Sequence, residues 1–313
     1  MKKTGKPNLK SKHFLLIAAL CAAVILPIVI LAVFAAPKSA AYPENVTVND
    51  TVYSYRDFLK GCILEQLKSL DEPPTDADAA GINAAGAAIH SSIVYLYGIN
   101  GLNRDCFPCV KFMSEKECAE HFGENAEQYI SSADCAADYA LCTRISYNGR
   151  NVFLPVCRIS SGALTDPADA GLDMPWLKKL YCPRDKYAAG YSGGCQLTSG
   201  GLSQILLAKY PDIVLPPETD SRISDIRTDG GGNVLSLAVC GINMSGYEFC
   251  RMFGIRSVCF EMTCSQGLYT FTTKGDGDSI GMSVYAAVQM SRSGSNEKEI
   301  LNTFYNADVE EIR

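Results

Sequence analysis

An uncharged apolar segment near the N-terminus most constrains what this chain can fold into. Residues 14–37 carry no charged side chain, while residues 1–13 carry five lysines and no acid. About 20 apolar residues suffice for a helix to cross a bilayer, whereas the apolar core of a cleaved signal peptide is usually about 7–15 residues long. We therefore expect 14–37 to be an uncleaved transmembrane anchor, with 1–13 as a basic cytoplasmic tail and the rest outside.

The chain that follows the anchor is acidic. Five of the 28 basic residues precede the anchor, which leaves 23 basic and 34 acidic residues and a net charge of −11. A protein that binds nucleic acid shows the opposite balance, so nucleic acid is not an expected partner. Residues 38–45 read as a spacer, and 46–313 read as one exported domain.

Thirteen of the 14 cysteines follow the anchor. An exported domain can hold disulfides, but an odd count leaves at least one free thiol unless all are reduced. Most lie in apolar segments, where cysteine behaves as a small hydrophobic residue. Cys106 and Cys109 form the one local pair. A redox or zinc site there remains an alternative, but it needs a βαβ context or two further ligands. We expect neither metal nor cofactor.

Turn residues and alternating apolar residues mark the strands. Alternation predicts a strand over 46–53. Asn148-Gly149 is a strong hairpin signal, and two further reversals are expected at Gly230–Gly232 and Ser265–Gly267. No regular strand–helix–strand order is present, so we expect an α+β fold with mixed antiparallel strands and helices.

Helices are expected where capping residues precede apolar residues at helical spacing. Ser54 to Asp57 opens the first, and Ser245 to Glu248 opens a late one. A short helix between Ser114 and Gly123 lies in an expected insertion near 99–135. The first helix covers about 55–70, and two further helices are predicted over 80–97 and 197–208.

Several segments carry a family resemblance. Phe58-Leu-Lys-Gly-Cys-Ile-Leu-Glu-Gln-Leu precedes a small-residue helix and Cys157-Arg-Ile-Ser-Ser-Gly-Ala-Leu-Thr165. Met244-Ser-Gly-Tyr-Glu-Phe follows, and then Gly275-Asp-Gly-Asp-Ser-Ile-Gly-Met-Ser-Val-Tyr-Ala-Ala. In this order they resemble the motifs of the stage II sporulation protein D family (the SpoIID/LytB domain), whose late turn reads G-x-G-H-G-x-G-M-S-Q-x-G-A. The resemblance covers roughly 50–312, outside 99–130.

The resemblance implies a peptidoglycan-acting domain. In this family a single Glu protonates the glycosidic oxygen and then assists attack by the sugar's own 6-hydroxyl, which gives a 1,6-anhydro end. One carboxyl of raised pKa serves as acid and then as base. The implied setting is septal peptidoglycan remodelling and engulfment. The implied partners are glycan strands, a septal amidase and a membrane scaffold protein.

The family's catalytic Glu is replaced in this chain. Aligned without a gap, it falls on Gln66, and Glu65 precedes it. Gln66 lies within an apolar helical stripe, whereas Glu65 lies ~100° around the helix. Since Gln cannot donate and recover a proton, Gln66 is expected in a cleft without the family's acid function, and Glu65 as a solvated acid. The alternative is that Glu65 serves as a shifted acid.

Other motif positions also differ. The family's middle His corresponds to Arg158, its late His to Asp278, its Gln to Val284 and its Arg to His90. We expect Arg158 to bind a sugar or carboxylate, or else to pair with Asp166 or another surface acid. Asp278 is expected just before a helix start, where a negative charge is favourable. His90 is expected to be structural.

The glycan-binding candidates implied by the resemblance share its middle and late blocks. They are Arg158, Ser161, Gly162, Thr165, Asp278, Ser283 and Tyr285. Packing in the first helical turn is the other interpretation of the last two. A serine hydrolase is not expected, because Ser161 has no nearby His–Asp pair.

Two functions therefore remain open. One is an anchored lytic transglycosylase, which requires Glu65 or another acid to replace the family's Glu. The other is a noncatalytic module that binds glycan strands or recruits a partner hydrolase.

Overall fold

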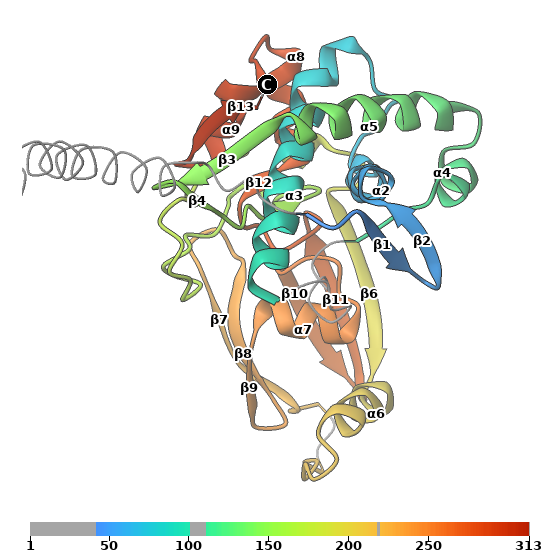
Figure 1. Cartoon of the computed structure of the whole chain (residues 1–313). Helices are drawn as coiled ribbons and strands as arrows, with labels where there is room; N and C mark the ends of the chain where they lie inside the picture. Colours follow the sequence, from blue (N-terminus) through green and yellow to red (C-terminus); the bar gives the residue numbers. More distant parts are fainter. Residues whose placement is uncertain (1–41, 101–110, 218–219, 313) are drawn as a thin grey trace, which may run out of the picture. The chain divides into compact units, whose positions relative to one another are not determined.

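Helices and antiparallel hairpins make up most of the described chain (Figure 1). The computed structural model describes residues 42–100, 111–217 and 220–312. The expected anchor, the basic tail and the Cys106–Cys109 pair lie outside these residues. The described residues belong to one compact unit, Tyr42–Arg313.

The first strands form a hairpin, not the single strand expected over 46–53. β1 (Asn45–Val48) pairs antiparallel with β2 (Thr51–Ser54). The two residues between them, Asn49 and Asp50, have φ values of 45° and 64°. Both are residue types that tolerate the left-handed region. The expectation was wrong because Asn49-Asp50 forms a tight turn in the middle of the predicted strand.

A helical core occupies the first half of the described chain and its C-terminal end. Its helices are α2 (Tyr55–Leu67), α3 (Ala79–Asn100), α5 (Ala126–Leu141), α8 (Val284–Arg292) and α9 (Glu297–Phe304), with the 3-10 turn η1 (Asp76–Asp78) before α3. Ser54 caps α2 as expected, since its side chain accepts a hydrogen bond from the Asp57 backbone. Leu59, Ile63 and Ile93 are fully buried in this core.

Part of the expected insertion contributes to the same core. α4 (Glu115–Phe122) begins with the predicted capping box of Ser114 and Glu117 and ends at Gly123. The 3-10 turn η3 (Gly123–Asn125) leads into α5. Met113, Cys118 and Tyr129 are buried core residues, so this region packs as an integral part of the domain.

Two small sheets connect distant parts of the chain. The predicted Asn148-Gly149 turn joins β3 (Thr143–Tyr147) to β4 (Arg150–Asn151), and β13 (Asp308–Glu311) pairs with the other edge of β3. β5 (Val156–Cys157) pairs in parallel with β12 (Met282–Ser283). The middle block of the sequence therefore lies beside the late glycine-rich turn.

A second hydrophobic core is built from two three-stranded antiparallel sheets and two helices. One sheet has the order β10 (Phe260–Ser265), β11 (Leu268–Lys274), β6 (Ser192–Thr198), and the other β7 (Ile223–Thr228), β8 (Val234–Val239), β9 (Ile242–Ser245). The helices are α6 (Ser199–Lys209) and α7 (Gly246–Phe253), and η4 (Asp185–Tyr187) precedes β6. Phe249, Tyr269 and Phe271 fill this core. The expected hairpins and the Ser245–Glu248 cap are confirmed, and the fold is α+β.

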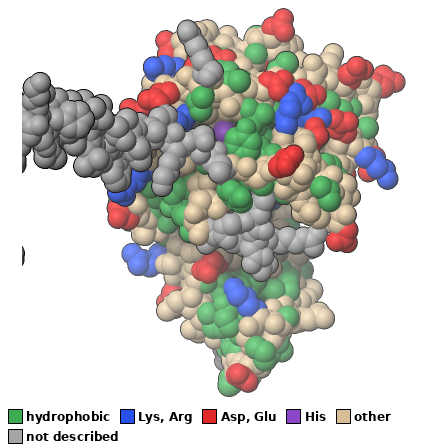
Figure 2. Space-filling model, in the orientation of Figure 1, with side chains coloured by type: hydrophobic (Ala, Val, Ile, Leu, Met, Phe, Trp, Pro, Cys, Tyr) green, Lys and Arg blue, Asp and Glu red, His purple; other side chains and the backbone are tan. Residues whose placement is uncertain are grey.

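One described helix is long and apolar enough to cross a membrane. It spans Asp76–Ile99, but 72% of its apolar window is buried inside the domain. The core helix of a folded domain passes the same test, so this helix gives only weak support for membrane association. Figure 2 shows a surface on which Asp and Glu side chains are widely spread, in keeping with the net charge of −6 for the whole chain.

Candidate functional site

A cleft lies where the two hydrophobic cores meet. It consists of two adjoining cavities of about 290 and 350 Å³, which together reach the size of ordinary ligand sites. Val156, packed on the helical core, and Val258, in the second core, line both cavities. The other shared lining residues are Gln66, Tyr247 and Asp278. Segments far apart in sequence therefore converge on one cleft.

Gln66 occupies the position that its helical stripe predicts. It is half-buried near the end of α2 and lines both cavities. Glu65 differs from expectation: it is 7% exposed, not solvated. Its Oε2 lies 2.6 Å from Lys68 Nζ and its Oε1 lies 3.3 Å from Arg158 Nη1. The solvated interpretation was wrong because Arg158, 93 residues away in sequence, covers this face of the helix.

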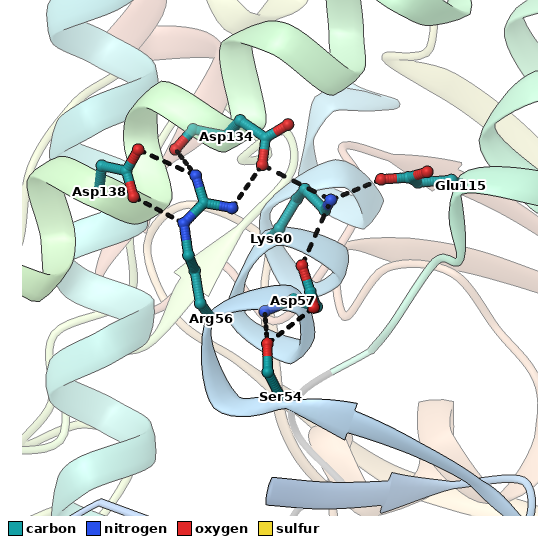
Figure 3. Close-up of polar contacts among 7 residues, drawn as sticks. All are labelled: Ser54, Arg56, Asp57, Lys60, Glu115, Asp134 and Asp138. Atoms are coloured by element: carbon teal, nitrogen blue, oxygen red, sulfur yellow. Dashed lines mark hydrogen bonds and ion pairs between the residues drawn. The ribbon is translucent and has the colours of Figure 1, made fainter. Parts of the chain in front are cut away.

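A polar network fixes α2, and with it Gln66, against the neighbouring helices (Figure 3). Arg56 donates to both carboxylate oxygens of Asp138, at 2.7 and 2.9 Å, and to Asp134 at 2.7 Å. Lys60 pairs with Glu115 and lies 3.5 Å from both Asp57 and Asp134. Burial alone would lower the pKa of Lys60, but the Glu115 hydrogen bond and the nearby carboxylates raise it overall. These bidentate and shared contacts fix the orientation of α2.

Arg158 lines the second cavity and belongs to a chain of ion pairs. Its Nη2 lies 2.9 Å from Asp276 Oδ1, and Asp276 Oδ2 lies 3.3 Å from Arg256 Nη2. The expected partner Asp166 is not the acid it contacts; Glu65 and Asp276 are. Arg158 therefore links α2 to the late glycine-rich turn, while its 16% exposed side chain still borders the cavity.

Asp278 lines both cavities but is not at a helix start as expected. Three further residues and strand β12 separate it from α8, whose N-cap is Ser283. Ser279 follows it in the left-handed region, with φ 54°. Asp278 Oδ1 accepts a hydrogen bond from the Ile280 backbone at 3.2 Å. Burial raises the pKa of Asp278 to about 6, and the backbone hydrogen bonds only partly oppose this shift.

The middle-block loop borders the first cavity through Thr165. Thr165 is buried, and its backbone N–H donates to the Ser279 carbonyl at 2.8 Å. Ser161 donates from its hydroxyl to the Ala163 carbonyl at 3.1 Å. Gly162 has φ 99°, a backbone conformation that favours glycine. This loop is thus fastened to the turn that carries Asp278.

Ser283 and Tyr285 are packed into the structure. Ser283 is fully buried, caps α8 by accepting from the Ala286 backbone, and donates to Asp185 Oδ2 at 2.6 Å. Tyr285 is 7% exposed and packs beside Ile159. The first-turn packing interpretation describes both residues.

Asp185 is a buried residue that joins two of the motif segments, and the sequence did not reveal it. Its Oδ2 accepts from the Ser160 backbone at 2.8 Å, from the Ser160 hydroxyl at 2.6 Å and from Ser283. It is fully buried, and this burial raises its pKa despite those hydrogen bonds. It joins the middle block to the late turn. It lies at the start of the short 3-10 turn η4, in a stretch without apolar periodicity or motif, so no local signal marks it.

His90 is a structural histidine, as expected. It is 7% exposed, its Nδ1 lies 2.8 Å from the Tyr55 hydroxyl, and burial lowers its pKa to about 4. All eleven described cysteines are free thiols. Within residues 42–100, 111–217 and 220–312 no group of three or more His, Cys, Asp or Glu side chains is arranged to hold a metal ion.

Two curated relatives resemble this chain. Stage II sporulation protein D of Bacillus subtilis (strain 168) is 24% identical over 197 residues, which cover 62% of this chain and 55% of the relative. Stage II sporulation protein D of Bacillus amyloliquefaciens is 24% identical over 251 residues, which cover 77% of this chain and 71% of the relative. The chain thus spans about half the length of the first relative. No family model matches the chain.

Proposed function

The chain is a divergent member of the stage II sporulation protein D family, and on that premise we propose that it acts on peptidoglycan during sporulation. Its ligand is the glycan strand, in the denuded form left after stem peptides are removed. The cleft between the two hydrophobic cores is the binding site. The proposed reaction is lytic transglycosylation, which leaves a 1,6-anhydro end.

One observation carries this proposal. Gln66 stands at the position of the family's Glu, Asp278 stands at the position of its late His, and both line the same two cavities. Thr165, from the middle block, lines the first of them. Three segments that resemble family motifs therefore converge on one cleft, which supports a retained glycan site.

The lining of the cleft suits a sugar chain. Phe153 and Tyr247 supply aromatic surface, and Ser92, Thr165 and Gln66 supply hydrogen-bonding groups. Ligand sites commonly combine mostly apolar walls with a few placed polar groups. The second cavity adds the guanidinium groups of Arg158 and Arg256, which can bind a carboxylate of the strand.

The chemistry of Gln66 and the ion pairs of Glu65 favour a second candidate function. Gln66 cannot exchange a proton as Glu does, and Glu65 is already engaged by Lys68 and Arg158. A chain without an acid would act as a noncatalytic module that binds glycan strands and stimulates or recruits a septal amidase, together with a membrane scaffold protein.

We place the domain on the outer face of the cell membrane, or in the septal intermembrane space of a sporulating cell. Residues 14–37 would anchor it, and the lysines before them would keep the N-terminus in the cytoplasm.

The test uses the full-length chain, purified in detergent. It is mixed with intact peptidoglycan and with amidase-denuded strands; sedimentation measures binding and mass spectrometry measures 1,6-anhydro ends. We expect binding to denuded strands and release of anhydro products. Binding without products, with products appearing in Gln66→Glu, would support the noncatalytic module. A chain that neither binds nor cuts the strands would refute the proposal.

Glu65→Ala, run beside the parent chain, tests the shifted-acid alternative. Products that vanish while binding and folding persist would identify Glu65 as the acid. We expect products to be reduced but retained, because Glu65 supports Arg158 and does not line either cavity of the cleft.

A further inference from the structure

We propose that Asp278 is the proton donor and acceptor of the cleft, in place of the Glu that the family carries at position 66. This inference rests on the proposed function and deepens it, because it names the group that performs the acid–base step. It assigns a catalytic role to a residue whose sequence position suggested only glycan contact.

Asp278 lies beside the position where the family carries its Glu. Asp278 and Gln66 line both cavities, so they border the same part of the cleft. Gln66 is contributed by α2, and Asp278 by the turn between β11 and β12. A carboxyl group at Asp278 therefore faces the space that the carboxyl group of a Glu at position 66 would face.

The two acids of the late turn, Asp276 and Asp278, differ in their charged partners. Asp276 lies between Arg158 and Arg256, at 2.9 and 3.3 Å, so its charge is neutralised by cations. Asp278 forms no ion pair with any residue in the described part of the chain, and its carboxylate accepts hydrogen bonds from the backbone of Ile280 and of Asp278 itself. Both acids line the second cavity, and Asp278 is the one whose charge is not neutralised by an ion pair among the described residues.

The groups around Asp278 affect its protonation. Asp278 contributes to the raised pKa of three buried groups, Cys157, Cys250 and Tyr305; burial is the larger cause for each, and all three are neutral near neutral pH. Arg158, Arg251, Arg256, Lys111 and Asp276 border the second cavity. Burial holds the Asp278 pKa at about 6, although its backbone hydrogen bonds oppose the shift. A carboxyl group with such a pKa is partly protonated near neutral pH, as a general acid requires.

The step balances without water, metal or cofactor. The Asp278 carboxyl gives its proton to the glycosidic oxygen, the bond from that oxygen to the anomeric carbon breaks, and the next sugar leaves with a free hydroxyl. The 6-hydroxyl of the sugar that remains attacks its own anomeric carbon and gives its proton to the Asp278 carboxylate. The products are a 1,6-anhydro end and a shortened strand, and Asp278 is protonated again.

The test uses the full-length chain in detergent on amidase-denuded glycan strands, with anhydro ends and strand binding measured separately. Asp278→Asn keeps the shape of the side chain and removes its acidity. We expect anhydro products to fall by about 100-fold or more while strand binding persists. Asp308→Asn, on the exposed strand β13, is the matched control and should cut as the parent chain does.

The pH profile is a second readout, which remains informative if Asp278→Asn does not fold. Product formation by the parent should fall as pH rises above about 6, because the acid loses its proton, and Asp278→Glu should restore part of the activity. Undiminished cutting by Asp278→Asn, or a flat profile across this range, would overturn the role of Asp278 and leave glycan binding intact. A parent chain that binds strands but releases no anhydro ends would also overturn it. If the parent neither binds nor cuts, the proposed function fails as well.

Discussion

Glu65 Oε1 lies 3.3 Å from Arg158 Nη1, and both side chains are mostly buried, with 9% and 16% of their surface exposed. This ion pair joins the second half of α2 to the middle block of the chain. Arg158 continues the link to Asp276 in the late turn. Ion pairs thus connect three motif segments beside the cleft, and Glu65 helps to hold Arg158 in position.

Replacing Glu65 should therefore weaken the fold. Breaking a buried pair costs about 3–5 kcal/mol when the remaining charge has no other partner, but Arg158 keeps Asp276. We expect Glu65→Gln to lower the free energy of unfolding by about 1–3 kcal/mol, measured by urea denaturation. Glu120→Gln is the control, because Glu120 is 66% exposed and 3.9 Å from Lys116. It should change stability by less than about 0.5 kcal/mol; equal effects of the two variants would contradict this role of Glu65.

Close packing between α3 and α8 depends on a glycine. A Cβ atom added at Gly81 would lie 2.6 Å from Val288 Cα and 2.7 Å from the Ala287 carbonyl oxygen, both on the α8 backbone. Gly81→Ala should therefore force the helices apart and destabilise the domain by about 1–3 kcal/mol. Thermal unfolding of the variant measures this effect.

Gly98→Ala, in the same helix, is the matched control for that substitution. A Cβ atom at Gly98 meets nothing within 4 Å, so the higher helix propensity of alanine should leave stability unchanged or raise it by up to about 1 kcal/mol. If both alanine variants behave alike, the contact between α3 and α8 is not as close as described.

The sequence predicted features that depend on neighbouring residues. The Asn148-Gly149 hairpin, the Ser114 and Ser245 capping boxes and the orientation of Gln66 each follow from a few adjacent residues or from one helical stripe. Turn chemistry and caps act locally, so they could be read without knowledge of the fold.

Features that depend on distant contacts could not be predicted in this way. The burial of Glu65 results from Arg158, and the cluster around Asp185 joins residues up to 98 positions apart. The raised pKa of Asp278 depends on its burial in the cleft where the two hydrophobic cores meet. Helical spacing fixes which way a side chain points, but not what covers it.

His90 should make stability depend on pH. Its pKa is about 4 in the folded chain because of burial, against about 6.5 when unfolded. The unfolded chain therefore binds this proton more readily as pH falls from about 6.5 to 4, and the folded state loses up to about 3 kcal/mol over that range. His90→Gln should remove this component of the pH dependence in urea denaturation. His121→Gln, on the exposed end of α4, should retain it; two identical curves would contradict the assignment.

Asp278 should have the opposite effect, because its pKa of about 6 in the folded chain lies above the ordinary value near 3.8. Below about pH 4 the carboxyl is protonated in both the folded and the unfolded chain, so it does not change the free energy of unfolding. As pH rises to about 6 and beyond, the unfolded chain ionises more readily, and the folded state is penalised by up to about 3 kcal/mol. Asp278→Asn should thus be more stable than the parent by about 1–3 kcal/mol near pH 7.5, and the difference should disappear near pH 4. Urea denaturation at both pH values measures it. A variant less stable than the parent at pH 7.5 would show that the Asp278 carboxylate supports the fold. The expected gain in stability is instead typical of a functional polar group that is buried in a cleft at the expense of stability.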